Sequence, residues 1–98
     1  MIVQYIHDRK KNKLRGVMVA EKINDYPVIS WSYANFKAGD RFCKERGLKI
    51  AIGRFETKTN ANVPHEVIKL CNIFKKRVAR YFKVDEDSVN IVGKGNKF

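Results

Sequence analysis

The residues whose types and spacing most clearly indicate a function are the cations of segment 64–83, PHEVIKLCNIFKKRVARYFK. This segment contains a single acid, Glu66. If this segment is a helix, its outward polar side chains share one side: Lys69, Asn72, Lys76, Arg80 and Lys83. At 1.5 Å per residue this row is about 20 Å long. We expect it to contact the phosphate backbone of DNA or RNA, with Asn72 as the one side chain suited to a base edge. A solvated helix face without a partner is the alternative.

A second group of cations falls where the sequence predicts a turn between strands 2–7 and 14–23. It comprises Arg9, Lys10, Lys11, Lys13 and Arg15. We expect this hairpin tip to make a second phosphate contact, and Lys94 and Lys97 in a frayed tail at 93–98 to assist. Lysines on a turn that only keep an exposed hairpin soluble explain the same pattern.

Two aromatic side chains on the predicted strand 28–35 offer a different chemistry. Trp31 and Tyr33 alternate with small residues and therefore share one face. Stacking on unpaired bases is one use of such a face, and packing in the core is the other. We expect the core.

Enzyme chemistry has weaker signals. Asp40, Glu56 and Lys58 resemble the two carboxylates and lysine with which nucleases hold a divalent cation. Asp40 falls in a predicted helix, however, and the pattern is short enough to arise by chance. Cys43 and Cys71 are both expected to be buried, reduced thiols, and the cysteines and histidines lack zinc-site spacing. We expect a non-enzymatic protein with no metal or cofactor, and a metal-dependent nuclease is an alternative.

The helix that must position the cations has a broad apolar sector. Its members recur at helical spacing and are Val67, Leu70, Cys71, Phe74, Val78, Tyr81 and Phe82. Pro64 suits the first turn because proline has no backbone N–H to leave unpaired, and Asn62 or Val63 is expected to cap the helix.

The remaining elements follow from alternation and turn residues. Strands are predicted at 2–7, 14–23 and 28–35, with a bulge or close backbone approach at Gly16. A short helix from Asn35 to Arg46 ends at Gly47, and 48–55 reads as a fourth strand. Residues 89–92 are compatible with a fifth strand. This order, β-β-β-α-β-α with a possible C-terminal β, predicts an α+β domain. Its mostly antiparallel sheet has four or five strands, with one short and one long helix.

Composition limits the class of protein. The 98 residues include 21 Lys and Arg against 10 Asp and Glu, for a net charge of +11. A pI near 9.9 is typical of nucleic-acid-binding domains. A single domain spanning 1–98 is expected. We also expect a cytoplasmic protein with no membrane partner, because no apolar run has the length of a spanning helix.

Residues 16–54 contain two runs that resemble a known group of proteins. The runs GVMVA and ISWSYANFKAGDRFCKERGLKIAIGR are similar to small, mostly uncharacterised basic proteins encoded by bacteriophages. The resemblance implies a phage product acting in the bacterial cytoplasm, without catalytic residues. It is compatible with packaging, with replication and with interference in a host system. A phage inhibitor that binds a host protein through its basic face is therefore an alternative to nucleic-acid binding.

Overall fold

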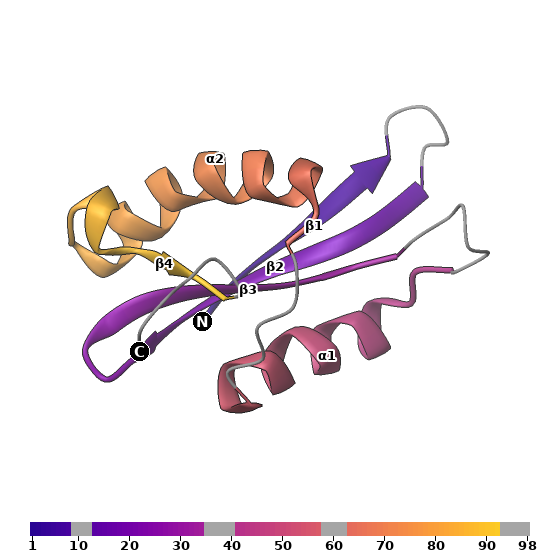
Figure 1. Cartoon of the computed structure of the whole chain (residues 1–98), viewed down its shortest axis with the longest axis horizontal. Helices are drawn as coiled ribbons and strands as arrows, with labels where there is room; N and C mark the ends of the chain where they lie inside the picture. Colours follow the sequence, from indigo (N-terminus) through magenta and orange to yellow (C-terminus); the bar gives the residue numbers. More distant parts are fainter. Residues whose placement is uncertain (9–12, 35–40, 58–62, 93–98) are drawn as a thin grey trace.

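Three antiparallel strands form most of the sheet in the computed structural model, and a short fourth strand completes it (Figure 1). The strands are β1 Ile2–Asp8, β2 Lys13–Ile23, β3 Tyr26–Tyr33 and β4 Asn90–Ile91. They lie in the order β1-β2-β3-β4, and β4 is parallel to β3. The structure describes residues 1–8, 13–34, 41–57 and 63–92. The expected α+β class, with a mostly antiparallel sheet, two helices and a C-terminal strand, is confirmed.

The hairpin of β1 and β2 contains a bulge. Ile6 pairs with Gly16 and His7 pairs with Leu14, so Arg15 is the extra residue on β2. A β carbon on Gly16 would lie 2.6 Å from the backbone oxygen of Ser32 on β3, which no side chain tolerates. The bulge and the close backbone approach expected at Gly16 are both present.

A tight turn connects β2 to β3. Asn24 and Asp25 both have positive φ, at 50° and 69°, and Ile23 pairs directly with Tyr26. Two central residues with positive φ form the type I′ turn that matches the twist of a hairpin, and Asn and Asp tolerate it. The turn residues of the sequence therefore fix the register of these two strands.

The two helices cover opposite faces of the sheet (Figure 1). On β2, Val17 and Val19 pack with helix α1, Lys44–Thr57, whereas Met18 and Ala20 pack with helix α2, His65–Phe82. Because both faces are covered, the middle of β2 is a continuous apolar run rather than an alternating one. The result is a three-layered domain with a core on each side of the sheet.

The segment 48–55 is the main correction to the predicted elements. It forms the body of α1 and is not a strand, and the predicted helix end at Gly47 lies instead in the first turn of α1. Leu48, Ala51 and Phe55 recur at helical spacing and pack on the sheet, whereas Ile50 is 42% exposed. The alternation that favoured a strand therefore placed Ile50 on the wrong side. Asn35 and Asp40, in the predicted short helix, lie outside the described residues.

Gly47 has a packing role. A β carbon at this position would overlap the ring of Phe42, which precedes α1 and packs edge-to-face with Tyr5 of β1 at 6.4 Å between ring centres. Glycine here allows the aromatic side chain to cover the first turn of the helix. Gly47, which suggested a helix end in the sequence, is therefore a site of close packing at the start of a helix.

Helix α2 follows the predicted segment closely. Val67, Cys71, Phe74 and Val78 are buried against the sheet as expected, but Tyr81 is 59% exposed and does not belong to the apolar sector. The N-cap is Pro64, not Asn62 or Val63, and it makes no side-chain cap hydrogen bond. At the other end Lys83 adopts the left-handed conformation, with φ at 57°, and ends the helix.

The cysteines differ in their surroundings. Cys71 is buried on α2 as expected, but Cys43 is exposed just before α1, contrary to the prediction of a buried thiol. Neither forms a disulfide. Within the described residues, no helix is long and apolar enough to cross a membrane.

Candidate nucleic-acid interface

The side chains predicted to contact phosphate lie on the outer face of α2. All five are exposed, on the side of the helix opposite the buried residues: Lys69, Asn72, Lys76, Arg80 and Lys83. We call the four cations among them the α2 basic strip. The amphipathic pattern explains this placement, because burying Val67, Cys71, Phe74 and Val78 fixes the rotation of the helix about its axis.

The α2 basic strip forms no ion pair with the described residues. The ion pairs found among the described residues are Met1 with Glu21, Arg15 with Asp8 and Glu66, and Lys49 with Glu45. None involves the strip. Four ammonium and guanidinium groups therefore face water and have no carboxylate partner in the described part of the chain.

Two other cations of α2 are placed differently. Arg77 is exposed, but its guanidinium donates a hydrogen bond to the side-chain oxygen of Gln4 on β1, at 3.1 Å. Lys75 is half-buried. Arg77 therefore links the helix to the edge strand, and we leave both residues outside the strip.

A hollow of about 620 Å³ lies at the C-terminal end of the strip. Lys76, Arg80 and Lys83 line one part of it, and Asp85 and Glu86 line another. The two acids belong to the only acidic cluster of the sequence and lie around the short 3-10 helix η2, Glu86–Ser88. Carboxylates repel phosphate, so Asp85 and Glu86 weaken the attraction of this end of the strip for an anion.

The hairpin tip is described only in part. Arg9, Lys10 and Lys11 lie outside the described residues, as do Lys94 and Lys97. Lys13 is exposed. The phosphate contact predicted for the tip therefore stays a prediction for these residues.

Arg15 is held inside a cluster of charged groups. Its guanidinium lies 3.4 Å from Glu66 and 3.8 Å from Asp8, and it covers the ring of Tyr33 at 4.6 Å from the ring centre. The Tyr33 hydroxyl donates a hydrogen bond to Glu66. The cluster joins β1, β2 and β3 to the first turn of α2, which favours a structural role for Arg15 over phosphate binding.

The same cluster changes the acidity of Tyr33. Burial, followed by the hydrogen bond to Glu66, raises the pKa of Tyr33 to about 12. Arg15 acts in the opposite direction because a nearby cation favours the phenolate. The phenol is therefore neutral at physiological pH and acts as a hydrogen-bond donor, not as a base.

Trp31 belongs to the core, as predicted. It is 4% exposed, and its indole N–H donates to the backbone oxygen of Val92 at 3.1 Å. The guanidinium of Arg54 lies over the ring at 4.2 Å from its centre. Trp31 is therefore not available to stack on a base, and neither is the face of Tyr33 that Arg15 covers.

The sequence did not reveal the structural role of Arg54, because the predicted strand 48–55 put this residue at a strand end. It lies in the last turn of α1, where its guanidinium donates to the backbone oxygen of Trp31 at 2.5 Å. Strand β4 pairs only with Val28 and Ile29, so Arg54 satisfies the edge of β3 beyond the point where β4 ends. Burial lowers the pKa of Arg54. No local signal identifies this role, since it depends on a strand edge 23 residues away.

The nuclease pattern has no described metal site. Asp40 and Lys58 lie outside the described residues, and Glu56 belongs to the last turn of α1 rather than to a strand end, contrary to expectation. Among the described side chains, no group of three or more His, Cys, Asp or Glu is placed to hold a metal ion.

Comparisons with protein-family models, with curated proteins and with solved structures found no match to this chain.

Proposed function

We propose that this protein is a small, phage-encoded, non-enzymatic protein of the bacterial cytoplasm that binds nucleic acid through the phosphate backbone, with α2 as its contact surface. The observation that carries the proposal is the α2 basic strip. Lys69, Lys76, Arg80 and Lys83 are exposed on one helix face and have no carboxylate partner among the described residues. A net charge of +11 adds a long-range attraction for polyanions.

The dimensions of the strip suit a polyphosphate strand. From Lys69 to Lys83 the helix advances about 20 Å at 1.5 Å per residue, which corresponds to about six phosphates at 3.4 Å per nucleotide of one strand. Four cations spread over that length meet several phosphates at once. Asn72 is the one amide side chain of this row and the one we expect to touch a base, so we expect affinity for many sequences and little discrimination between them.

Salt dependence tests this proposal directly. Each phosphate contact releases condensed counterions, so four contacts predict a slope of about −3 to −4 for log K against log salt on duplex DNA. Replacing Lys76 and Arg80 by Ala should weaken binding to all sequences and make the slope shallower by nearly two, at about 0.9 per contact. The matched control replaces Lys22 and Lys49, which are exposed away from α2, and removes the same charge.

Titration of labelled duplex DNA, single-stranded DNA and RNA at several salt concentrations gives these slopes. An unchanged slope in the Lys76 and Arg80 variant, or an equal change in the control, means that the strip does not touch phosphate. Incubation of the wild type with plasmid or RNA and Mg²⁺ or Mn²⁺ should leave both uncut. Cleavage that disappears in both Asp40→Ala and Glu56→Ala would show that the protein is a metal-dependent nuclease.

A second candidate function has one specific observation in its favour. Ile73 is 66% exposed and lies between Lys69 and Lys76 on α2. An apolar side chain amid cations suits an acidic protein surface with an apolar centre, as for a phage inhibitor docking on a host protein. A pull-down after nuclease treatment tests this alternative. A stoichiometric host protein that Ile73→Ser releases, while DNA affinity is unchanged, would support it.

A further inference from the structure

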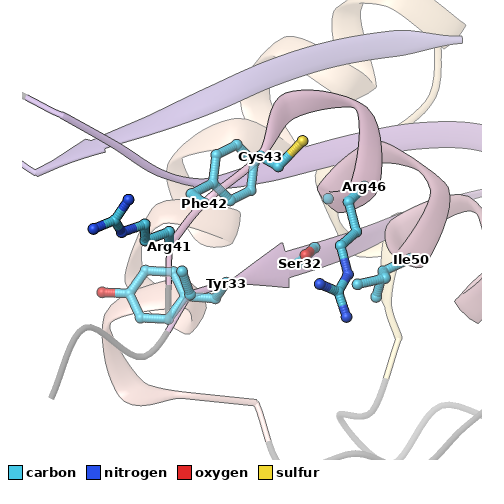
Figure 2. A pocket seen from close by; sticks show the side chains of 9 residues that line it. Ser32, Tyr33, Arg41, Phe42, Cys43, Arg46 and Ile50 are labelled. Carbon is cyan, nitrogen blue, oxygen red and sulfur yellow. The ribbon is translucent and has the colours of Figure 1, made fainter. Parts of the chain in front are cut away.

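A pocket of about 390 Å³ lies on the other side of the molecule from the α2 basic strip, between the end of β3 and the start of α1 (Figure 2). Its walls come from Ser32 to Ala34 and from the segment that enters α1, including Arg41, Phe42 and Arg46. The volume falls within the range of small-molecule sites, about 300–1,000 Å³. It therefore has room for a ligand of several rings or groups.

The polar groups of the pocket suit an anion. Arg41 and Arg46 line it, neither forms an ion pair in the described part of the chain, and no carboxylate is among the described residues of its wall. The pocket adjoins the first turn of α1, a 14-residue helix whose opening N–H groups have no partner within the helix. Guanidinium groups and the unpaired backbone N–H groups of a helix N-terminus both bind phosphate.

Ser32 adds a hydroxyl donor to the pocket. It is only 6% exposed, yet among the described residues its hydroxyl has no hydrogen-bond partner. Ser30, two residues earlier on the same face, instead donates to the backbone oxygen of Ala51. Figure 2 shows the Ser32 side chain in the pocket between Tyr33 and Arg46. The hydroxyl opens into the pocket, where a phosphate oxygen would accept its hydrogen bond.

Part of the wall is apolar. Phe42, Ile50 and Ala34 line the pocket, and Ile50 is 42% exposed although it is a large aliphatic side chain. An isolated phosphate ion would leave this surface in water. A flat, partly apolar group attached to the phosphate would cover it, as a nucleoside does.

We propose that this pocket binds a nucleotide through a terminal phosphate monoester. The phosphate is held by Arg46, the Ser32 hydroxyl and the first turn of α1, with Arg41 at the mouth, and the nucleoside lies against Phe42 and Ile50. The ligand is either a free nucleoside monophosphate or the phosphorylated end of a nucleic-acid strand, because both carry the same group. The site is separate from the α2 basic strip and does not depend on the function proposed for it.

Calorimetric titration with AMP, and with inorganic phosphate, tests the pocket. AMP should bind more tightly than phosphate, Arg46→Gln should weaken AMP binding at least tenfold, and Ser32→Ala should weaken it about threefold to tenfold. Lys49→Gln is the matched control, since it removes one exposed charge from the next turn of the same helix and should leave AMP binding unchanged. Thermal melts of each variant confirm that it is folded.

The source of the nucleotide is decided with oligonucleotides of one sequence that carry a 5′ phosphate or a 5′ hydroxyl. If the strand end is the ligand, the phosphate should increase affinity in the wild type, and Arg46→Gln should abolish that difference. The Lys76 and Arg80 variant should keep the difference between the two oligonucleotides, whatever its effect on overall affinity. Failure of both AMP and the 5′ phosphate to bind, binding of phosphate as tight as AMP, or equal losses in Arg46→Gln and Lys49→Gln would each overturn the proposal.

Discussion

Arg54→Ala tests the contact that closes the edge of β3. The guanidinium donates to the Trp31 backbone oxygen at 2.5 Å and lies 4.2 Å from the centre of the Trp31 ring. A hydrogen bond from a charged group contributes about 1.5–3 kcal/mol, and a cation–π contact adds about 0.5–1 kcal/mol where water has access. Arg54 is half-buried, so we expect Arg54→Ala to lower the free energy of unfolding by about 2–4 kcal/mol.

Urea unfolding followed by circular dichroism measures this loss, and tryptophan emission reports on the same place, because Trp31 is the only tryptophan in the chain. Removing Arg54 opens one face of the indole to water, and the emission of the folded protein should shift to longer wavelength. Arg54→Lys keeps the charge but not the planar group that stacks on the ring, and should lie between the wild type and Arg54→Ala.

Arg80→Ala is the control for Arg54→Ala, because it removes an exposed guanidinium from a helix and should change stability by less than about 0.5 kcal/mol. Equal unfolding midpoints for the two variants, with unshifted emission, would mean that Arg54 does not stabilise the edge of β3. The assignment of this residue to the sheet edge would then be wrong.

Two further predictions concern α2 and the charged cluster. Phe74→Ala should destabilise by about 3–5 kcal/mol because Phe74 is 1% exposed in the core, whereas Lys76→Ala should change stability by less than about 0.5 kcal/mol. Equal thermal melts for these two variants would show that the helix faces are assigned wrongly. The pKa of Tyr33 is raised from 10.0 to about 12, so the folded state holds this proton more tightly and stability should fall as pH rises through that interval. Tyr33→Phe should make urea midpoints between about pH 10 and about pH 12 less dependent on pH, and an undiminished dependence would contradict the assignment.

The sequence by itself determined the elements whose pattern is long or whose turns are distinctive. The apolar residues of α2 recur over about four helical turns, so both its buried face and its basic face were predicted, except for Tyr81 near the end. The hairpin of β1 and β2 and the turn at Asn24 and Asp25 follow from alternation and from residues that tolerate positive φ. These features are local, and neighbouring residues along the chain suffice to specify them.

Where a sequence pattern is short or fits more than one structure, only the tertiary structure decided which structure forms. The segment 48–55 is compatible with a strand or a helix, and the apolar surface of Val17, Val19 and Val28 selected the helix by burying Ala51 and Phe55. Arg15 and Arg54 read as solvent-facing cations, yet each is held by groups from distant parts of the chain. The pocket at Ser32 likewise joins the end of a strand to the start of a helix. A periodic pattern shows which face of an element is apolar, but the partner that covers it, and the cations that close its edges, depend on contacts between residues far apart in sequence.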